Sequence, residues 1–253
     1  KVYGAIDPAL TYTITGFVNS DAESDLDTGV TISRVAGETV ADYIITPSEA
    51  VDSNYVITFV PSTFEITQAN LTVTATSGLS KIYGEIDPTL TYSITGFVNS
   101  DAEASLDTGV TISRVAGETV GDYTITPSEA VDSNYVITFV PSTFEITQAN
   151  LTVTATSGLS KIYGEIDPTL TYTITGFVNS DAESDLDIGV TMTRVAGETV
   201  GDYTITPSEA ADSNYVITFV PSTLEITQAN LTVTATSGLS KVYGEIDPTL
   251  TYS

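Results

Sequence analysis

The chain has 253 residues, of which 41% are hydrophobic, and it carries 33 acidic against 7 basic residues, a formal net charge of −26. This content suffices for folded cores, whereas the charge argues against nucleic acid or an anionic membrane surface as partner, because phosphate recognition needs clustered Lys and Arg. With no Cys, His or Trp, the thiol and imidazole groups of most nucleophilic catalysts and transition-metal sites are missing. We therefore expect no enzyme, no resident cofactor and, since no run of 18 apolar residues occurs, no membrane insertion in this segment.

An octapeptide recurs along the chain and fixes an internal period. It reads "KVYGAIDP" at residue 1, "KIYGEIDP" at 81 and 161, and "KVYGEIDP" at 241, which gives a period of 80 residues. Residues 1–80 and 81–160 differ at only 8 positions. A unit of this length with its own apolar pattern can close a core, so we expect tandem domains rather than a solenoid.

Within a repeat, apolar and polar residues alternate with a period of two, the pattern of half-buried strands. A polar segment, "NSDAEASLD" at 99–107, is long enough for only one or two helical turns, with Ser100 or Asp101 as N-cap. The sequence thus predicts an all-β fold of small β-sandwich or β-grasp-like domains of about 80 residues. In the second copy the expected strands, about six, are 71–76, 90–95, 109–114, 121–126, 134–139 and 142–147.

The inward-facing positions change parity twice near the end of each repeat. They shift from Phe139 to Phe144 across Pro141, where a bulge or corner is expected because proline cannot donate to a central ladder. They shift again from Ile146 to Leu151 across "QAN". One repeat thus passes into the next without a flexible linker, which restricts their relative angles. We expect domains arranged end to end as a rod.

The stretches "LTVTATSGLSKIYGEIDPTLTY", "GETVGDYTIT" and "NYVITF" with "TFEIT" resemble the MBG-type (YGX type) repeat of large bacterial cell-surface adhesins. The resemblance covers the whole chain and places the start of a unit at "LTVTA". It implies a partial repeat at 1–69 that lacks its first strand, complete repeats at 70–149 and 150–229, and the beginning of a fourth at 230–253.

The same resemblance implies a protein that is secreted to the bacterial cell surface. It favours a structural stalk or filament segment whose partners are the neighbouring repeats, and like-charged repeats would repel and keep an array extended. The alternative is a multivalent module that binds mucin or other glycans by avidity. An exposed aromatic cluster repeated on one face would favour that alternative.

One acidic turn invites a calcium interpretation. "DAESDLDTG" holds Asp21, Glu23, Asp25 and Asp27, and Ca²⁺ takes clustered carboxylates. The second copy replaces Asp25 by Ser105, and the spacing is not that of an EF-hand loop. We therefore favour a solvated acidic turn over a calcium site.

Other kinds of chemistry fit short stretches of the sequence less well. The single lysine of each repeat (Lys1, Lys81, Lys161, Lys241) would suit a Lys to Asn crosslink, and "NLT" at 70, 150 and 230 fits a glycosylation sequon. Glu85 with Asp87 could form a carboxylate pair for glycoside chemistry. The tyrosines at 83, 92, 123 and 135 fall at inward or turn positions, which favours core packing over a platform for sugar rings.

One further expectation concerns association. If the fragment were isolated, the strand 231–236, "LTVTAT", could complete the first repeat of a following copy, head to tail.

Overall fold

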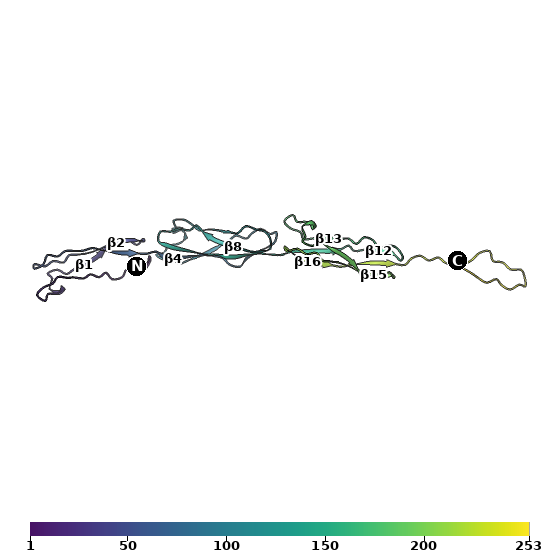
Figure 1. The fold of residues 1–253 in the computed structure, drawn as a ribbon, viewed down its shortest axis with the longest axis horizontal. Coiled ribbons are helices and arrows are strands. Elements are labelled where there is room, and N and C mark those ends of the chain that lie inside the picture. Colours follow the sequence, from purple (N-terminus) through teal and green to yellow (C-terminus); the bar gives the residue numbers. More distant parts are fainter. Residues whose placement is uncertain (253) are drawn as a thin grey trace. The chain divides into compact units, whose positions relative to one another are not determined.

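The computed structural model describes residues 1–252. The chain divides into two compact units, described here separately. Unit 1 contains Lys1–Lys81 and Glu85–Ile146, and unit 2 contains Ile82–Gly84 and the residues from Thr147 onward. Figure 1 shows strands and connecting segments without a long helix. Among the described residues no helix has the length and apolar character needed to cross a membrane.

The second repeat is a two-sheet all-β domain, as predicted. Its three-stranded sheet has the order β6-β4-β9 and its four-stranded sheet the order β5-β10-β8-β7. The strands are β4 (Ala69–Ala75), β5 (Leu79–Ile82), β6 (Tyr92–Thr95), β7 (Thr111–Arg114), β8 (Gly121–Ser128), β9 (Tyr135–Val140) and β10 (Ser142–Thr147).

Strand β4 is the centre of the three-stranded sheet. It pairs in parallel with β9 and antiparallel with β6. Its alternation of apolar and threonine residues directs Leu71 and Val73 inward, where both are fully buried. The four-stranded sheet supplies the facing core residues Ile125, Phe144 and Ile146.

Strand β5 was not predicted, so the expectation of about six strands fell one short of the seven that the structure has in this repeat. Its inward residue is Lys81, which is only 6% exposed. A lysine at the inward position removes the apolar alternation by which a strand is recognised in sequence. The buried ammonium is compensated by carboxylates, described below.

The predicted corner at Pro141 is confirmed. Strand β9 ends at Val140 in one sheet and β10 begins at Ser142 in the other, so the chain changes sheets at this proline. The polar segment 99–107 forms a single 3₁₀ turn, η2 (Glu103–Ser105). The predicted N-cap was wrong, because Ala102 caps the turn and the Ser105 hydroxyl accepts from the Ala102 amide.

The third repeat, in unit 2, has the same topology. Its sheets have the orders β13-β11-β16 and β12-β17-β15-β14. The strands are β11 (Ala149–Ala155), β12 (Leu159–Ile162), β13 (Tyr172–Thr175), β14 (Thr191–Arg194), β15 (Gly201–Ser208), β16 (Tyr215–Val220) and β17 (Ser222–Thr227), and a 3₁₀ turn, η3 (Glu183–Asp185), precedes β14.

The first repeat has only one sheet, formed by β1 (Thr31–Arg34), β2 (Ala41–Ser48) and β3 (Ser62–Ile66), with the turn η1 (Glu23–Asp25) before it. Residues 12–15 and 55–60, which correspond to β6 and β9, form no strand. Residues 228–252 also contain no strand, only an isolated bridge between Ala235 and Tyr252. The domain boundaries proposed from the sequence stay predictions.

Candidate functional site: a tyrosine junction between repeats

The passage from the first repeat to the second lies within unit 1. Strand β3 ends at Ile66 and β4 begins at Ala69. Thr67 forms a bridge with Val2, and Tyr3 donates its backbone N–H to the Thr67 carbonyl over 2.8 Å. Only Gln68 lies outside this pairing, so the predicted passage of strand into strand is confirmed at this junction.

Gln68 and Ala69 are bonded to the turn that precedes β9. The Gln68 Nε2 donates to the carbonyls of Ser133 at 3.2 Å and Tyr135 at 3.1 Å, and the Ala69 amide donates to the Asn134 carbonyl at 3.0 Å. The Asn134 Oδ1 in turn accepts from the amide of Val40, just before β2, at 3.0 Å. Hydrogen bonds therefore join the first repeat to the second directly, from Val40 to Asn134, and also fix the junction residues Gln68 and Ala69 to the second repeat.

Tyr3 of the first repeat inserts its side chain into the second repeat and is 8% exposed. Its ring meets that of Tyr135 edge to face, with centroids 5.5 Å apart and planes at 84°. Its hydroxyl donates to Asp101 Oδ2 at 3.0 Å, and the Tyr135 hydroxyl donates to the same oxygen at 2.7 Å. Burial raises the pKa of Tyr135 to about 12.

Gly4 follows Tyr3 and makes its approach possible. Its φ of +78° lies in the left-handed region, and a Cβ built there would come within 2.4 Å of Val98 Cγ2. Any other residue would meet both backbone strain and a clash with the second repeat. We call the pair Tyr3 and Gly4, and its equivalents in the other repeats, the Tyr-Gly loop.

The two repeats also share one hydrophobic core. Tyr3, Phe64 and Ile66 from the first repeat form a single buried cluster with Leu71 and Tyr135 from the second. A flexible tether would leave two separate cores. Here, movement of one repeat against the other would expose apolar surface, which costs about 25 cal/mol of free energy per Å². The junction is therefore held by packing as well as by hydrogen bonds.

An ion network fixes the Tyr-Gly loop to the first repeat. The Lys1 Nζ lies 2.6 Å from Asp7 and 2.5 Å from Glu38, while Arg34 contacts Asp7 at 2.5 Å and Glu38 at 2.8 Å. Hydrogen bonds from Arg34 and then Lys1 lower the pKa of Asp7 to about 2. Asp7 lies beyond the loop and Lys1 before it, so the network closes the loop that presents Tyr3.

Equivalent networks surround Lys81 in unit 1 and Lys161 in unit 2. The lysines considered for a Lys to Asn crosslink thus have carboxylates against their ammonium groups. Asp87, considered as half of a catalytic pair with Glu85, belongs to the Lys81 network and contacts Arg114 at 2.5 Å. Asp87 therefore forms structural ion pairs with Lys81 and Arg114.

Unit 2 contains the same junction contacts. The Tyr83 hydroxyl donates to Asp181 Oδ2 at 3.0 Å, and its ring meets that of Tyr215 at 5.5 Å and 85°. A Cβ on Gly84 would lie 2.5 Å from Val178. The arrangement at Tyr3 is therefore repeated, and it accounts for the inward positions predicted for Tyr83 and Tyr135.

The third Tyr-Gly loop makes no such contact. Tyr163 is 55% exposed, against 8% for Tyr3 and Tyr83. A Cβ on Gly164 would meet nothing within 4 Å. The loop is thus buried only where a folded repeat receives it.

The acidic turn considered for calcium has a different use in the structure. Asp21 accepts from the Tyr55 hydroxyl at 2.7 Å, Asp25 from the Ala22 amide at 2.8 Å, and Asp27 from the Ser53 amide at 2.9 Å, while Glu23 accepts from the Tyr12 hydroxyl. Across residues 1–252, no group of three or more carboxylates is placed to hold a metal ion. Asp101, the counterpart of Asp21, is the residue that receives Tyr3.

The sequence pattern did not reveal this role of the acidic turn. Sequence alone showed Asp101 as one carboxylate among ten in its repeat and Tyr83 as an inward residue. In near-identical repeats a pattern cannot tell whether a side chain packs within its own copy or into the next. The sequons at Asn70 and Asn150 lie exposed on β4 and β11, and their glycosylation stays a prediction.

Comparison with known proteins identifies the repeats. No curated protein matches the chain. A crystal structure of Drosophila N-cadherin EC1-3 aligns with 77% of this chain and 79% of the cadherin chain at 10% sequence identity. The TM-score of 0.20 is too low to indicate a common fold. The family model described as MBG domain (YGX type) matches residues 1–65, 71–145 and 151–225. The chain therefore belongs to the family of MBG domains of the YGX type.

Proposed function

We propose that this chain is a spacer segment of a secreted bacterial surface adhesin, in which the Tyr-Gly junction holds consecutive repeats at a fixed angle. MBG repeats are typical of extracellular surface proteins, and the family membership supports an adhesin-type repeat region. The observation that carries the proposal is the shared core of the first two repeats, with Tyr3 buried against Tyr135 and Asp101.

Three features support a mechanical role over a catalytic one. The junction uses a strand, a buried ring and hydrogen bonds at once, so rotation about any backbone bond of Gln68 would break several contacts together. The same contacts recur at Tyr83 in unit 2. The formal charge of −26 keeps such segments soluble and mutually repelling.

The exposure of aromatic residues favours the spacer over glycan binding. Sugar rings stack on exposed aromatic faces, but every Tyr and Phe of residues 70–149 is buried or half-buried. A binding face repeated in each domain would need such a residue on the outside. The glycan alternative is tested directly by a mucin or glycan array probed with the whole chain, where specific retention of the chain would contradict a pure spacer.

Distance measurements between spin labels test the fixed angle. The chain has no cysteine, so Asp42→Cys and Asp122→Cys would label equivalent exposed positions on β2 and β8 of unit 1. Pulsed electron resonance at low protein concentration should give one narrow distance distribution. Adding Tyr3→Ala should broaden it, because the buried ring and its hydrogen bond to Asp101 are lost.

Tyr163→Ala is the matched control, since this tyrosine is 55% exposed, and it should leave the distribution unchanged. A distribution that is broad in the parent protein, or insensitive to Tyr3→Ala, would mean that the repeats tumble independently. The spacer proposal would then fail.

A further inference from the structure

The second repeat is entered through its first strand and left through its last. The chain enters at Ala69, where β4 begins, and leaves at Thr147, where β10 ends. Only Gln148 then separates β10 from β11 of the third repeat. Tension along the backbone therefore acts on the second repeat at the beginning of β4 and at the end of β10.

The strands at the two ends of this path lie side by side and run in the same direction. β4 and β9 are parallel over six residue pairs, from Ala69 with Tyr135 to Thr74 with Val140. In the other sheet β5 lies next to β10, and the equivalent strands of the third repeat, β12 and β17, are parallel over four pairs. We call β4 and β5 together the entry segment, and β9 and β10 together the exit segment.

Further hydrogen bonds fasten the two segments to each other along their length. At the near end Ala69 is bonded to the turn before β9, as described above. Where both segments change sheets, the Ser142 hydroxyl donates to the Thr76 carbonyl at 2.8 Å. At the far end the Tyr83 amide donates to the Thr147 carbonyl at 2.8 Å. The equivalents of all three bonds are present in the third repeat, at 3.0, 2.8 and 2.9 Å.

Parallel strands that are pulled from opposite ends are loaded in shear. Tension drags the entry segment backward and the exit segment forward, so the hydrogen bonds of the whole ladder are strained together. Strands that are pulled apart from one shared end instead lose their hydrogen bonds one at a time. Since forced unfolding is governed by the unfolding rate, the direction of loading sets how strongly the fold resists.

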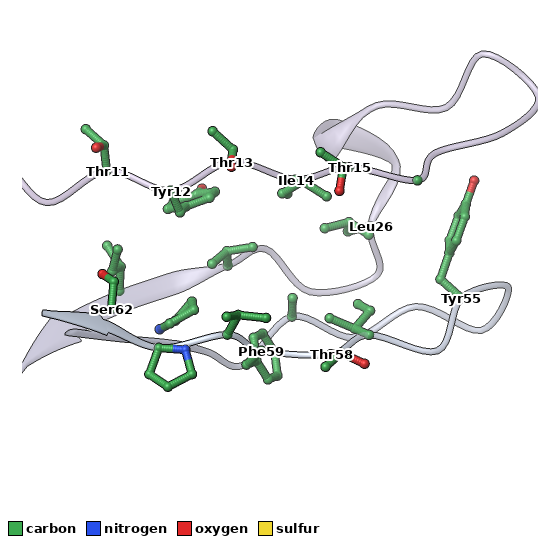
Figure 2. A pocket seen from close by; sticks show the side chains of 18 of the residues that line it. Thr11, Tyr12, Thr13, Ile14, Thr15, Leu26, Tyr55, Thr58, Phe59 and Ser62 are labelled. Atoms are coloured by element: carbon green, nitrogen blue, oxygen red, sulfur yellow. The ribbon is translucent and has the colours of Figure 1, made fainter. Parts of the chain in front are cut away.

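The pairing with β4 also maintains the conformation of β9. Among the described residues, β4 is the only strand that pairs with β9. In the first repeat the same six residues, 55–60, form no strand, and Figure 2 shows Tyr12 and Ile14 pointing toward the segment of Thr58 and Phe59 without a strand between them. Sliding of the two segments would therefore unfold the repeat rather than rearrange it.

We propose that the second and third repeats each act as a shear clamp, in which tension along the chain pulls the entry segment against the exit segment. Such a repeat resists force along the backbone better than force that peels the same strands apart. The chain then carries load in addition to setting a distance. The inference concerns each repeat by itself and depends neither on the junction angle nor on the adhesin role.

Single-molecule pulling of the whole chain tests the clamp. Because the chain has no cysteine, Glu65→Cys with Glu225→Cys gives two exposed attachment points, one before the second repeat and one near the end of the third. Tension between them loads both repeats along the backbone. Two unfolding events are expected, each lengthening the chain by roughly 20–25 nm, because about 80 residues extend at most 3.3–3.6 Å each and the folded length is subtracted.

The matched measurement pulls the same two strands in another direction. Asn70→Cys with Ser133→Cys places the attachment points at the start of β4 and just before β9, where both side chains are exposed. The same ladder then opens from one end, pair by pair. At equal loading rate the second repeat should unfold at about half the force or less, because its hydrogen bonds break singly rather than together.

One hydroxyl distinguishes the clamp from the rest of the repeat. Ser142→Ala removes the bond to Thr76 and should raise the unfolding rate of the second repeat at a given force about two- to tenfold. Ser113→Ala makes the same change on β7, outside both segments, and should leave that rate unchanged. The third repeat keeps its own serine, Ser222, and supplies a reference event in each molecule.

Each outcome decides the proposal. A higher force along the chain than in the peeling direction, together with a faster rate for Ser142→Ala alone, supports the clamp. Equal forces in the two directions overturn it, and so does an effect of Ser142→Ala no greater than that of Ser113→Ala. Independent tumbling of the repeats would contradict the spacer proposal without affecting this one, because the clamp lies within each repeat.

Discussion

The first and second repeats contain the same six residues, Tyr-Val-Ile-Thr-Phe-Val, at 55–60 and at 135–140, yet only the second forms a strand with them. Residues 12–15 likewise form no strand, although they differ from β6 only in having Thr13 where β6 has Ser93. The difference between the repeats is β4, which lies between β6 and β9 and hydrogen-bonds to both. The comparison teaches that these outer strands owe their conformation to their neighbour, since a strand that lacks a partner leaves its backbone groups unpaired.

The largest expected effect comes from weakening β4. Leu71→Ala should destabilise the second repeat by about 2–5 kcal/mol, because Leu71 is fully buried and the substitution leaves a cavity. Hydrogen exchange should show protection in β6 and β9 falling toward that of residues 12–15 and 55–60. Leu231→Ala, at the equivalent exposed position, should change stability by less than about 0.5 kcal/mol.

If β6 and β9 kept their protection when β4 was weakened, the outer strands would be stable without it. The contrast between the two repeats would then need another cause.

The Tyr-Gly loops allow the comparison to be made with one substitution at two sites. Gly84 and Gly164 have nearly the same φ, +85° and +90°, but only Gly84 faces Val178. Alanine at either position brings the same backbone strain and the same change in the unfolded chain. Gly84→Ala should therefore cost about 1–3 kcal/mol more than Gly164→Ala, which is the cost of the clash.

Melting curves of the two variants at low protein concentration measure this difference. Equal losses would show that Val178 moves aside freely and that the loop is not tightly docked.

The ion networks should respond to acid in the same way in both repeats, because they do not involve β4. Hydrogen bonds from the arginine hold the pKa of Asp7 and Asp87 at about 2, below the ordinary 3.8. Between about pH 4 and pH 2 the unfolded chain binds a proton that the folded chain does not, so the stability from each network is present above pH 4 and is lost across this window as pH falls.

Denaturant unfolding across this range, compared between the parent and Asp87→Asn, checks the prediction. The parent should lose more stability on acidification than the variant, whereas Asp122→Asn, an exposed change of equal charge, should follow the parent. Parallel curves for parent and Asp87→Asn would show that the network does not govern acid sensitivity.

The smallest effect is expected in a turn that both repeats share. Glu49 and Glu129 have φ of +70° and +67° in the turn after β2 and β8. Glycine relieves this strain, so Glu129→Gly should be about 1 kcal/mol more stable than Glu129→Ala, which removes the same charge but keeps the strain. The difference should be the same at Glu49, and thermal melting would show whether the turn is independent of β4.

The sequence predicted the fold well where apolar alternation governs it. The two parity shifts correctly indicated the corner at Pro141 and the direct passage into β4, because inward positions must follow the sheet to which they belong. It failed at β5, where Lys81 faces inward and its compensation by Asp87 and Glu118 comes from residues distant in the chain. It also could not place Tyr3, whose partner Asp101 lies 98 residues away in another copy.

The ion networks also affect how readily trypsin-like proteases can cleave the folded chain. Trypsin-like proteases cut after Lys or Arg, and all seven such residues are Lys1, Arg34, Lys81, Arg114, Lys161, Arg194 and Lys241. The first six have side chains no more than 11% exposed, whereas Lys241 is 45% exposed. Brief trypsin treatment of the folded protein should therefore remove little beyond the residues after Lys241, and mass spectrometry of the digest would show it. Because the ion pairs hold all but one of its cationic side chains in buried positions, this acidic protein has almost no accessible cleavage point.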